Sequence, residues 1–168
     1  MFVIDMLVTK LNNYRTMKKI TLLLVLLVTS ASFAQLKKIE TVKSEEIGKV
    51  GPFGLPKYID CQKAGNTYTF EYKDFKYPNI DEYKEFSFED VDNTFDDLYK
   101  TIIEGFETAP KEPITLGLPN YILTLQFNKA IGMTNLVIYA SPANNSSYVG
   151  QTVALTKKQI EKLFGKKK

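Results

Sequence analysis

One apolar stripe constrains the fold of this chain more than any other feature. Between Ser87 and Glu107, large apolar residues recur at steps of three and four, which is the spacing of one helix face: Val91, Phe95, Leu98, Tyr99, Ile102, Ile103 and Phe106. Ser87 can cap the first turn, with Asp90 three residues later. Pro110 ends the pattern. We therefore expect one long central helix, at about 88–107, whose stripe must be covered along its length.

Segments typical of strands flank this helix on both sides. Residues 67–77 and 121–127 have the apolar–polar alternation of strands, with a change of parity at Phe75 and Tyr77, and 135–140 form a nearly continuous apolar run. A capping box at its start and Gly165 at its end predict a short C-terminal helix at about 157–164. The order of strands, helix, strands and helix predicts an α+β fold. We expect mainly antiparallel sheets with the long helix packed on a face.

The N-terminal segment has the three-part pattern of a secretory signal peptide. A basic start at 17–19 precedes an apolar run at 20–28, and small residues follow before Gln35. That apolar run is shorter than the ~20 residues of a membrane span. We predict an upstream extension plus cleavable signal peptide at 1–34, with the signal itself at 17–34. A single α+β domain at 35–168 would then be exported to the periplasm or outside the cell, with no stable membrane anchor after cleavage.

Two methionines compete as the start of this signal. Residues 1–16 add nothing to the signal pattern, whereas Met17 is followed at once by two lysines. Met17 is therefore the better start of a signal peptide, and the sequence alone leaves the choice between Met1 and Met17 open.

Missing residue types exclude several kinds of chemistry. The chain has no histidine, and its single arginine, Arg15, lies upstream of the predicted domain. Nucleophile–histidine arrangements are therefore impossible, and zinc sites lose their commonest ligand. From Gln35 onward lysines and acidic residues are equal in number, which gives no general attraction to nucleic acid. These absences argue against an enzyme without excluding catalysis by carboxylates.

The acidic residues at the start of the expected helix do not form a calcium loop. Asp90 and Asp92 have the spacing of its first ligands, but the sixth position is Asp96 instead of glycine and the twelfth is Thr101 instead of glutamate. Acids in a first helical turn are explained by the positive helix end. The sequence therefore predicts no metal site, no cofactor and no catalytic residues. An excess of acids over lysines extends from residue 71 to 112.

Tyrosines mark the candidate binding surface. Aromatic residues crowd the stretch from 68 to 88, and most of them suit a hydrophobic core. Tyrosine also has a polar end, so a tyrosine-rich hairpin can form an exposed adhesive face. The residues that we assign to such a surface are Tyr68, Tyr72, Tyr77 and Tyr83.

Together these features favour a non-enzymatic binding or interaction module of the periplasm or cell envelope. Its partner is unknown, and another envelope protein is the natural candidate. Two alternatives remain open at this point. One is an exported hydrolase that uses Asp and Glu carboxylates. The other is an inhibitor or immunity-type protein whose acidic surface meets a basic target.

Overall fold

The structure is a computed structural model that describes residue 17 and residues 43–167, apart from 131, 146 and 148. Two units divide the chain, Met1–Glu40 and Thr41–Lys168, and the second contains the two sheets with their helices. The predicted signal peptide lies outside the described residues except for Met17, so that assignment stays a prediction. The fold class is confirmed: the second unit is α+β, with two antiparallel sheets and two helices.

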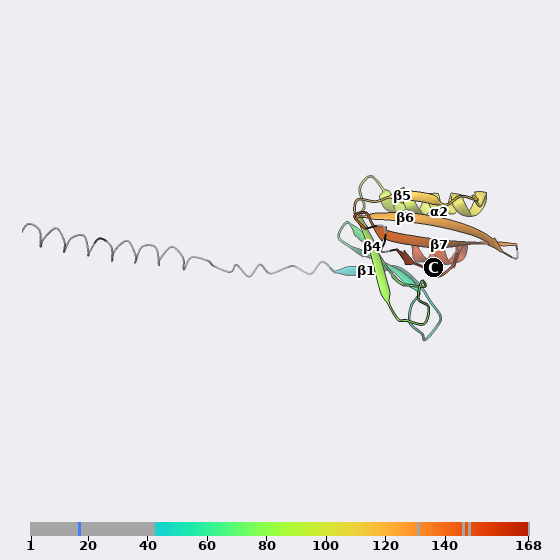
Figure 1. Ribbon diagram of the computed structural model, residues 1–168, viewed down its shortest axis with the longest axis horizontal. Coiled ribbons are helices and arrows are strands. Elements are labelled where there is room, and N and C mark those ends of the chain that lie inside the picture. The colour runs from blue at the N-terminus through green and yellow to red at the C-terminus, as the bar shows by residue number, and fades with distance from the viewer. Residues whose placement is uncertain (1–16, 18–42, 131, 146, 148, 168) are drawn as a thin grey trace, which may run out of the picture. The chain divides into compact units, whose positions relative to one another are not determined.

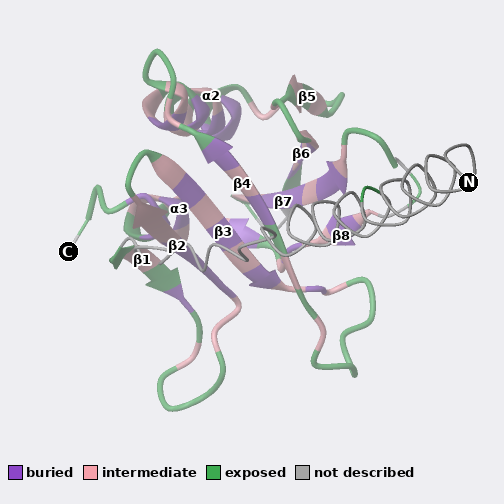
Figure 2. Cartoon of the chain, turned by 90° about the vertical axis from the view of Figure 1, so that its left-hand side faces the viewer, coloured by how far each residue is buried: buried purple, intermediate pink, exposed green. Residues whose placement is uncertain are grey.

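The first sheet is a four-stranded antiparallel meander in which each strand pairs with the next along the chain (Figure 1). Tyr68, Phe70 and Tyr72 all point to one face, which is buried, as the two-residue period requires. Figure 2 shows this alternation as bands along the third strand. The four strands are β1 (Ser44–Val50), β2 (Ile59–Ala64), β3 (Thr67–Lys73) and β4 (Tyr83–Glu89).

The second sheet is built around one long hairpin. Its two central strands pair along their whole length, and two short strands pair with different parts of the second of them. Leu123, Leu125 and Leu136 on this hairpin are fully buried. The strands are β5 (Ile114–Gly117), β6 (Tyr121–Ala130), β7 (Met133–Pro142), β8 (Gly150–Gln151) and β9 (Leu155–Thr156).

The long helix, α2 (Thr94–Thr108), begins six residues later than the sequence indicated. Residues 83–89 form strand β4 instead, where Ser87 lies opposite Thr69 of β3. Phe86 and Phe88 alternate with polar neighbours, and the sheet buries both of them. The start at about 88 was therefore wrong, because Ser87 with Asp90 has the spacing of a helix cap although Ser87 lies within a strand.

Local backbone geometry fixes the true start of α2. Asp92 and Asn93 adopt left-handed conformations, with φ of 54° and 66°, which reverses the chain between β4 and the helix. The carboxylate of Asp90 accepts a hydrogen bond from the Phe95 backbone N–H at 3.0 Å. The acid at position 90 thus satisfies an amide of the first turn, as expected of an acid near a helix N-terminus.

The apolar stripe of α2 contacts both sheets, whereas Val91, which the sequence placed at the start of the stripe, lies before the helix and is exposed. Near its start, the Phe95 ring stacks on Tyr68 of β3 with centroids 3.9 Å apart. Near its end, the Phe106 ring meets Phe127 of β6 edge to face at 5.4 Å. Gly105 lies so close to Phe127 that a Cβ there would fall 2.1 Å from the ring. The helix therefore joins the cores of the two sheets.

The short helix α3 (Lys157–Leu163) closes the same core, with the capping box that the sequence predicted. Thr156 and Gln159 exchange hydrogen bonds at its start, and Ile160 and Leu163 are fully buried. Its last turn packs directly on β1 at Gly48. A Cβ at Gly48 would lie 2.1 Å from the Lys162 carbonyl oxygen, so the close approach of helix and strand requires glycine there.

Candidate functional site

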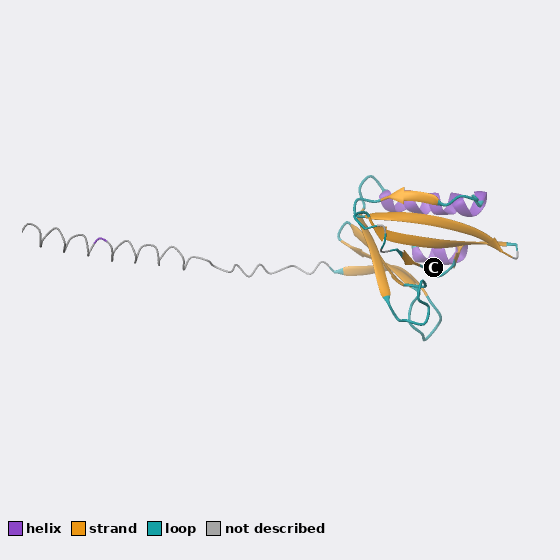
Figure 3. Cartoon of the chain, in the orientation of Figure 1, coloured by secondary structure: helices purple, strands orange, loops and turns teal. Residues whose placement is uncertain are grey.

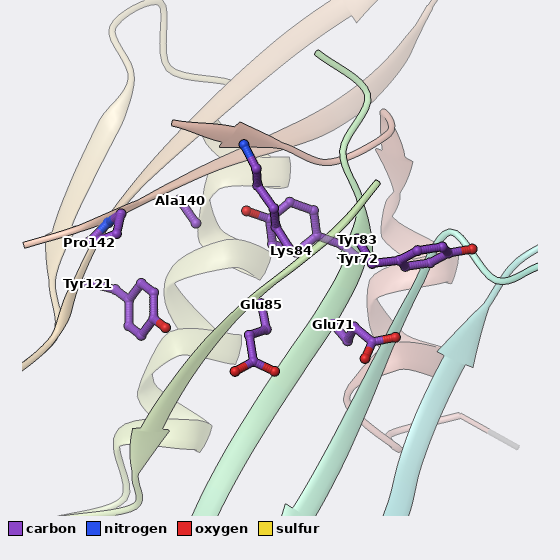
Figure 4. A pocket seen from close by; sticks show the side chains of 8 residues that line it. All are labelled: Glu71, Tyr72, Tyr83, Lys84, Glu85, Tyr121, Ala140 and Pro142. Carbon is purple, nitrogen blue, oxygen red and sulfur yellow. The ribbon is translucent and has the colours of Figure 1, made fainter. Parts of the chain in front are cut away.

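A cavity of about 340 Å³ lies beside β4, between the first sheet and the end of the β6–β7 hairpin (Figure 4). This volume is within the range of about 300–1,000 Å³ that is common for ligand sites. Charged groups and tyrosines contribute most of its lining residues, which are Glu71, Tyr72, Tyr83, Lys84, Glu85, Tyr121, Ala140 and Pro142. We call it the β4 cleft.

Two carboxylates stand side by side in the β4 cleft. Glu71 on β3 and Glu85 on β4 are directly opposite in the strand pairing, so they share the outer face of the first sheet. Like charges in directly opposed positions destabilise a sheet. Asp60 on β2 pairs with Glu71, which extends the row of carboxylates across a third strand. The pairing therefore concentrates negative charge on this face.

One lysine offsets part of that charge. The Lys57 ammonium lies 2.7 Å from a carboxylate oxygen of Asp60 and 2.7 Å from one of Glu71. Partial burial alone would lower the pKa of Lys57, but the hydrogen bonds to these two carboxylates outweigh it and raise the pKa. No described cation lies within ion-pair distance of Glu85. One lysine thus pairs with two carboxylates, and no described cation pairs with Glu85.

The inner side of the same strands holds a second, buried ion pair. Asp74 follows β3 and is fully buried, with the Lys84 ammonium 2.7 Å from its carboxylate. The other carboxylate oxygen accepts hydrogen bonds from the backbone N–H groups of Lys76 and Gln151, each at 3.0 Å. Burial alone would raise the pKa of Asp74, but Lys84 and the two amides outweigh it and hold the pKa below its ordinary value.

Asp74 therefore links the two sheets by a hydrogen bond. Its carboxylate binds the amide of Gln151, which lies in β8 of the second sheet. The next residue, Phe75, donates its own amide to the Gln151 carbonyl at 2.8 Å. These contacts hold the β3–β4 connection against β8, and the same carboxylate holds Lys84, which lines the β4 cleft.

The four tyrosines of the predicted surface do not form one surface. Tyr68 and Tyr72 are buried, with 7% and 1% of their surface exposed, whereas Tyr77 and Tyr83 are 49% and 36% exposed. Tyr72 and Tyr83 both line the β4 cleft, from opposite faces of the first sheet. The Tyr83 hydroxyl donates a hydrogen bond to the Lys57 carbonyl at 3.2 Å. The structure thus brings two of the four tyrosines to one cavity.

Sequence reasoning did not single out Glu71, Glu85 or Tyr121. The acidic excess between 71 and 112 was the signal that included both glutamates. Nothing in the sequence pairs them, because the contact depends on the register between β3 and β4. Tyr121 enters the cleft from the second sheet, near the start of β6.

The acids at the start of α2 have other uses. The Asp96 carboxylate pairs with the Lys166 ammonium at 2.8 Å, and the hydrogen bond to Lys166 lowers the pKa of Asp96. Within the described ranges, no cluster of three or more His, Cys, Asp or Glu side chains is placed to hold a metal ion.

Cys61 lies on the inner face of β2 and is fully buried. Burial, and then the neighbouring charge of Asp60, raises the pKa of its thiol to about 12. A thiol in this position is a small core residue and a poor nucleophile.

We expect Cys61 to be inert toward a water-soluble aromatic disulfide reagent at about pH 8 in the native protein, because the reacting species is the thiolate. The same cysteine should react in full once denaturant exposes it. Rapid stoichiometric labelling of the native protein would contradict the buried placement of this residue.

No helix in the described part of the chain has the length and apolarity that a membrane crossing requires. Comparison of the chain with protein-family models, with curated proteins and with solved structures gives no match.

Proposed function

We propose that this domain is a non-enzymatic binding module and that the β4 cleft takes a basic side chain presented by a partner protein. The observation that carries the proposal is the uncompensated carboxylate of Glu85, which lies in a cavity beside Glu71. A lysine or arginine of the partner would supply a cation for Glu85, which no described cation pairs with.

Tyrosines around the carboxylates support the same class of ligand. Tyr83 and Tyr121 line the cleft together with Glu85, and aromatic rings attract cations through their faces. Tyrosine is also enriched at protein interfaces, because it contributes a large contact area and one polar atom. In such a site the carboxylates bind the ammonium or guanidinium group of a lysine or arginine, and the aromatic rings contact the methylene groups of the same side chain.

The proposed setting is the periplasm or the exterior of the cell, with an envelope protein as partner. This setting rests on the signal-peptide pattern at 17–34. An inhibitor or immunity-type protein with a basic target would use the same acidic face, so that alternative differs only in which partner is bound.

The hydrolase alternative receives less support. Glycoside hydrolysis needs two carboxyl groups that flank the scissile bond. Glu71 and Glu85 extend from one face of adjacent strands, so both would approach a bound sugar from the same side (Figure 4). This arrangement suits two acceptors that share one cation.

We expect the substitution Glu85→Gln to weaken binding of an end-blocked lysine tetrapeptide about fivefold, because it removes an exposed charge interaction. Isothermal titration calorimetry measures this change directly. The matched control is Glu112→Gln, which removes the same charge from an exposed loop residue that does not line the cleft and should leave the affinity unchanged. Equal affinities for the two variants, or equal binding of an end-blocked glutamine tetrapeptide, would rule out the cleft as a site for cations.

A further inference from the structure

Two loops at the same end of the first sheet expose large apolar side chains. The β1–β2 loop carries Phe53, which is fully exposed, and Leu55, while the β3–β4 loop carries Tyr77 and Ile80. Figure 3 shows both loops extending beyond that end of the sheet, in teal. Most of the exposed large apolar residues in the described part of the chain lie on these two loops or on Tyr83 next to them.

A hollow of about 490 Å³ lies beside the first of these loops, between β1 and the C-terminal end of α3. We call it the basic hollow, because four lysines line it and Glu46 is the only acid among its lining residues. Leu55 and Pro52 of the β1–β2 loop also line it. Cationic and apolar groups therefore share one surface, which is lined by Pro52, Leu55, Lys49, Lys57, Lys162 and Lys167.

Part of the positive charge in the basic hollow is uncompensated. Lys57 is neutralised by Asp60 and Glu71, and Lys167 lies 3.8 Å from a Glu161 carboxylate oxygen. No described carboxylate lies within ion-pair distance of Lys49 or Lys162. These two ammonium groups, one on β1 and one on α3, are therefore available to an anion.

We propose that this end of the domain docks reversibly on an anionic phospholipid surface. Phe53 and Leu55 enter the boundary between head groups and acyl chains, and Lys49 and Lys162 bind head-group phosphates. A loop that combines exposed apolar side chains with neighbouring lysines matches the two layers that such a surface presents.

The same features are a poor match for a protein partner. Lysine is depleted at protein–protein interfaces, and their buried centres lose charged residues first. At an anionic lipid surface the lysines stay hydrated and add attraction, and the apolar side chains still leave water. The chain's overall charge balance gives no such attraction, so docking depends on how these particular lysines are placed.

Two sets of substitutions separate the apolar and cationic contributions. Binding is measured by titration of the purified protein with vesicles of phosphatidylglycerol and of phosphatidylcholine. We expect Lys49→Gln with Lys162→Gln to raise the Kd for phosphatidylglycerol about 25-fold, because each lysine contributes about fivefold. Phe53→Ser should raise it about tenfold. Lys111→Gln and Val91→Ser are the matched controls, since both residues are exposed elsewhere, and neither should change the Kd.

A probe at residue 53 distinguishes vesicle binding by the β1–β2 loop from vesicle binding by the apolar N-terminal segment. Since Cys61 is buried, a Phe53→Cys variant can be labelled at residue 53 alone with an environment-sensitive fluorophore. We expect its emission to shift to the blue with phosphatidylglycerol vesicles and not with phosphatidylcholine vesicles or soluble glycerol phosphate. The same label on a Val91→Cys variant should not shift.

The proposal is overturned if the label at residue 53 stays in water while the protein is bound to vesicles. It is also overturned if the lysine variants bind phosphatidylglycerol as tightly as the unmodified chain. A third outcome also overturns it: soluble glycerol phosphate binds through Lys49 and Lys162 as tightly as the vesicles do, and the label at residue 53 does not shift. That result would indicate a site for phosphate alone and exclude docking on a lipid surface.

Discussion

Replacing Asp74 with alanine is expected to lower the free energy of unfolding by about 3–5 kcal/mol, the usual result of removing one partner of a buried ion pair. The substitution leaves the Lys84 ammonium without this carboxylate and deprives the amides of Lys76 and Gln151 of their acceptor. Because Gln151 belongs to β8, the loss weakens the connection between the two sheets. Urea unfolding followed by circular dichroism measures the change.

The control for this prediction is Asp81→Ala. Asp81 pairs with Lys73 at 2.6 Å, but its side chain is 79% exposed, so its loss should change stability by no more than about 0.5 kcal/mol. Similar losses for the two variants would mean that the buried pair has no special role.

The Asp74 contribution also has a defined dependence on pH. The folded state holds the pKa of this carboxyl below its unfolded value of about 3.9. The stabilisation is therefore complete above about pH 4 and is lost as the pH falls through the lower, folded-state pKa. The stability difference between the native chain and an Asp74→Asn variant should shrink over that acidic range. A difference that stays constant down to about pH 2 would contradict the ion-pair origin of the effect.

Truncating Phe70 to alanine is expected to cost about 3–5 kcal/mol, because it opens a cavity in the middle of the aromatic core. The Phe70 ring stacks on Phe86 with centroids 4.8 Å apart and also contacts Phe95 of α2 and Phe164 at the end of α3. The change is measured as the shift in the urea unfolding midpoint between variants whose unfolding curves have the same m-value. The surrounding rings come from both helices and from β4, so the site cannot collapse without moving several elements.

Phe53→Ala is the matched control, since it removes the same side chain from a fully exposed position. It should change stability by no more than about 0.5 kcal/mol. A large loss at position 53 would show that the β1–β2 loop packs on the domain, and it would also undercut the exposure on which the lipid-docking proposal depends.

Local signals predicted much of this fold. The alternation through Tyr68, Phe70 and Tyr72 placed these three side chains on one face of β3, and the capping box at Thr156 and Gln159 identified α3. Each of these patterns spans only a few residues, so it can be recognised in the sequence without knowing the rest of the fold.

The start of α2 could not be read with the same certainty. Val91 lies four residues before Phe95 and Ser87 resembles a cap, so the helical pattern was extended back to about 88, although Ser87 belongs to a strand and Val91 lies before the helix. Asn93 marks the true break, because asparagine adopts the left-handed conformation more readily than most residues. That signal is weak beside a run of large apolar residues, so periodicity dominated the sequence-based interpretation.

The candidate site depends on contacts that no local pattern contains. Glu71 and Glu85 become neighbours through strand register, and Tyr121 reaches them from the other sheet. The basic hollow likewise joins Lys49 of β1 to Lys162 of α3. The alternation does place Tyr68 and Tyr72 on one face, but the choice between core and solvent for that face required the partner elements.

The position of Phe164 has a consequence for how this chain folds during synthesis. Its ring packs on Phe70, Phe95 and Tyr99, which belong to elements made much earlier. β1, the first strand described, is likewise covered by the last helix at Gly48. The aromatic core therefore cannot close until residue 164 has left the ribosome. Contacts over such sequence distances keep the core of the nascent chain open until this residue can reach its partners.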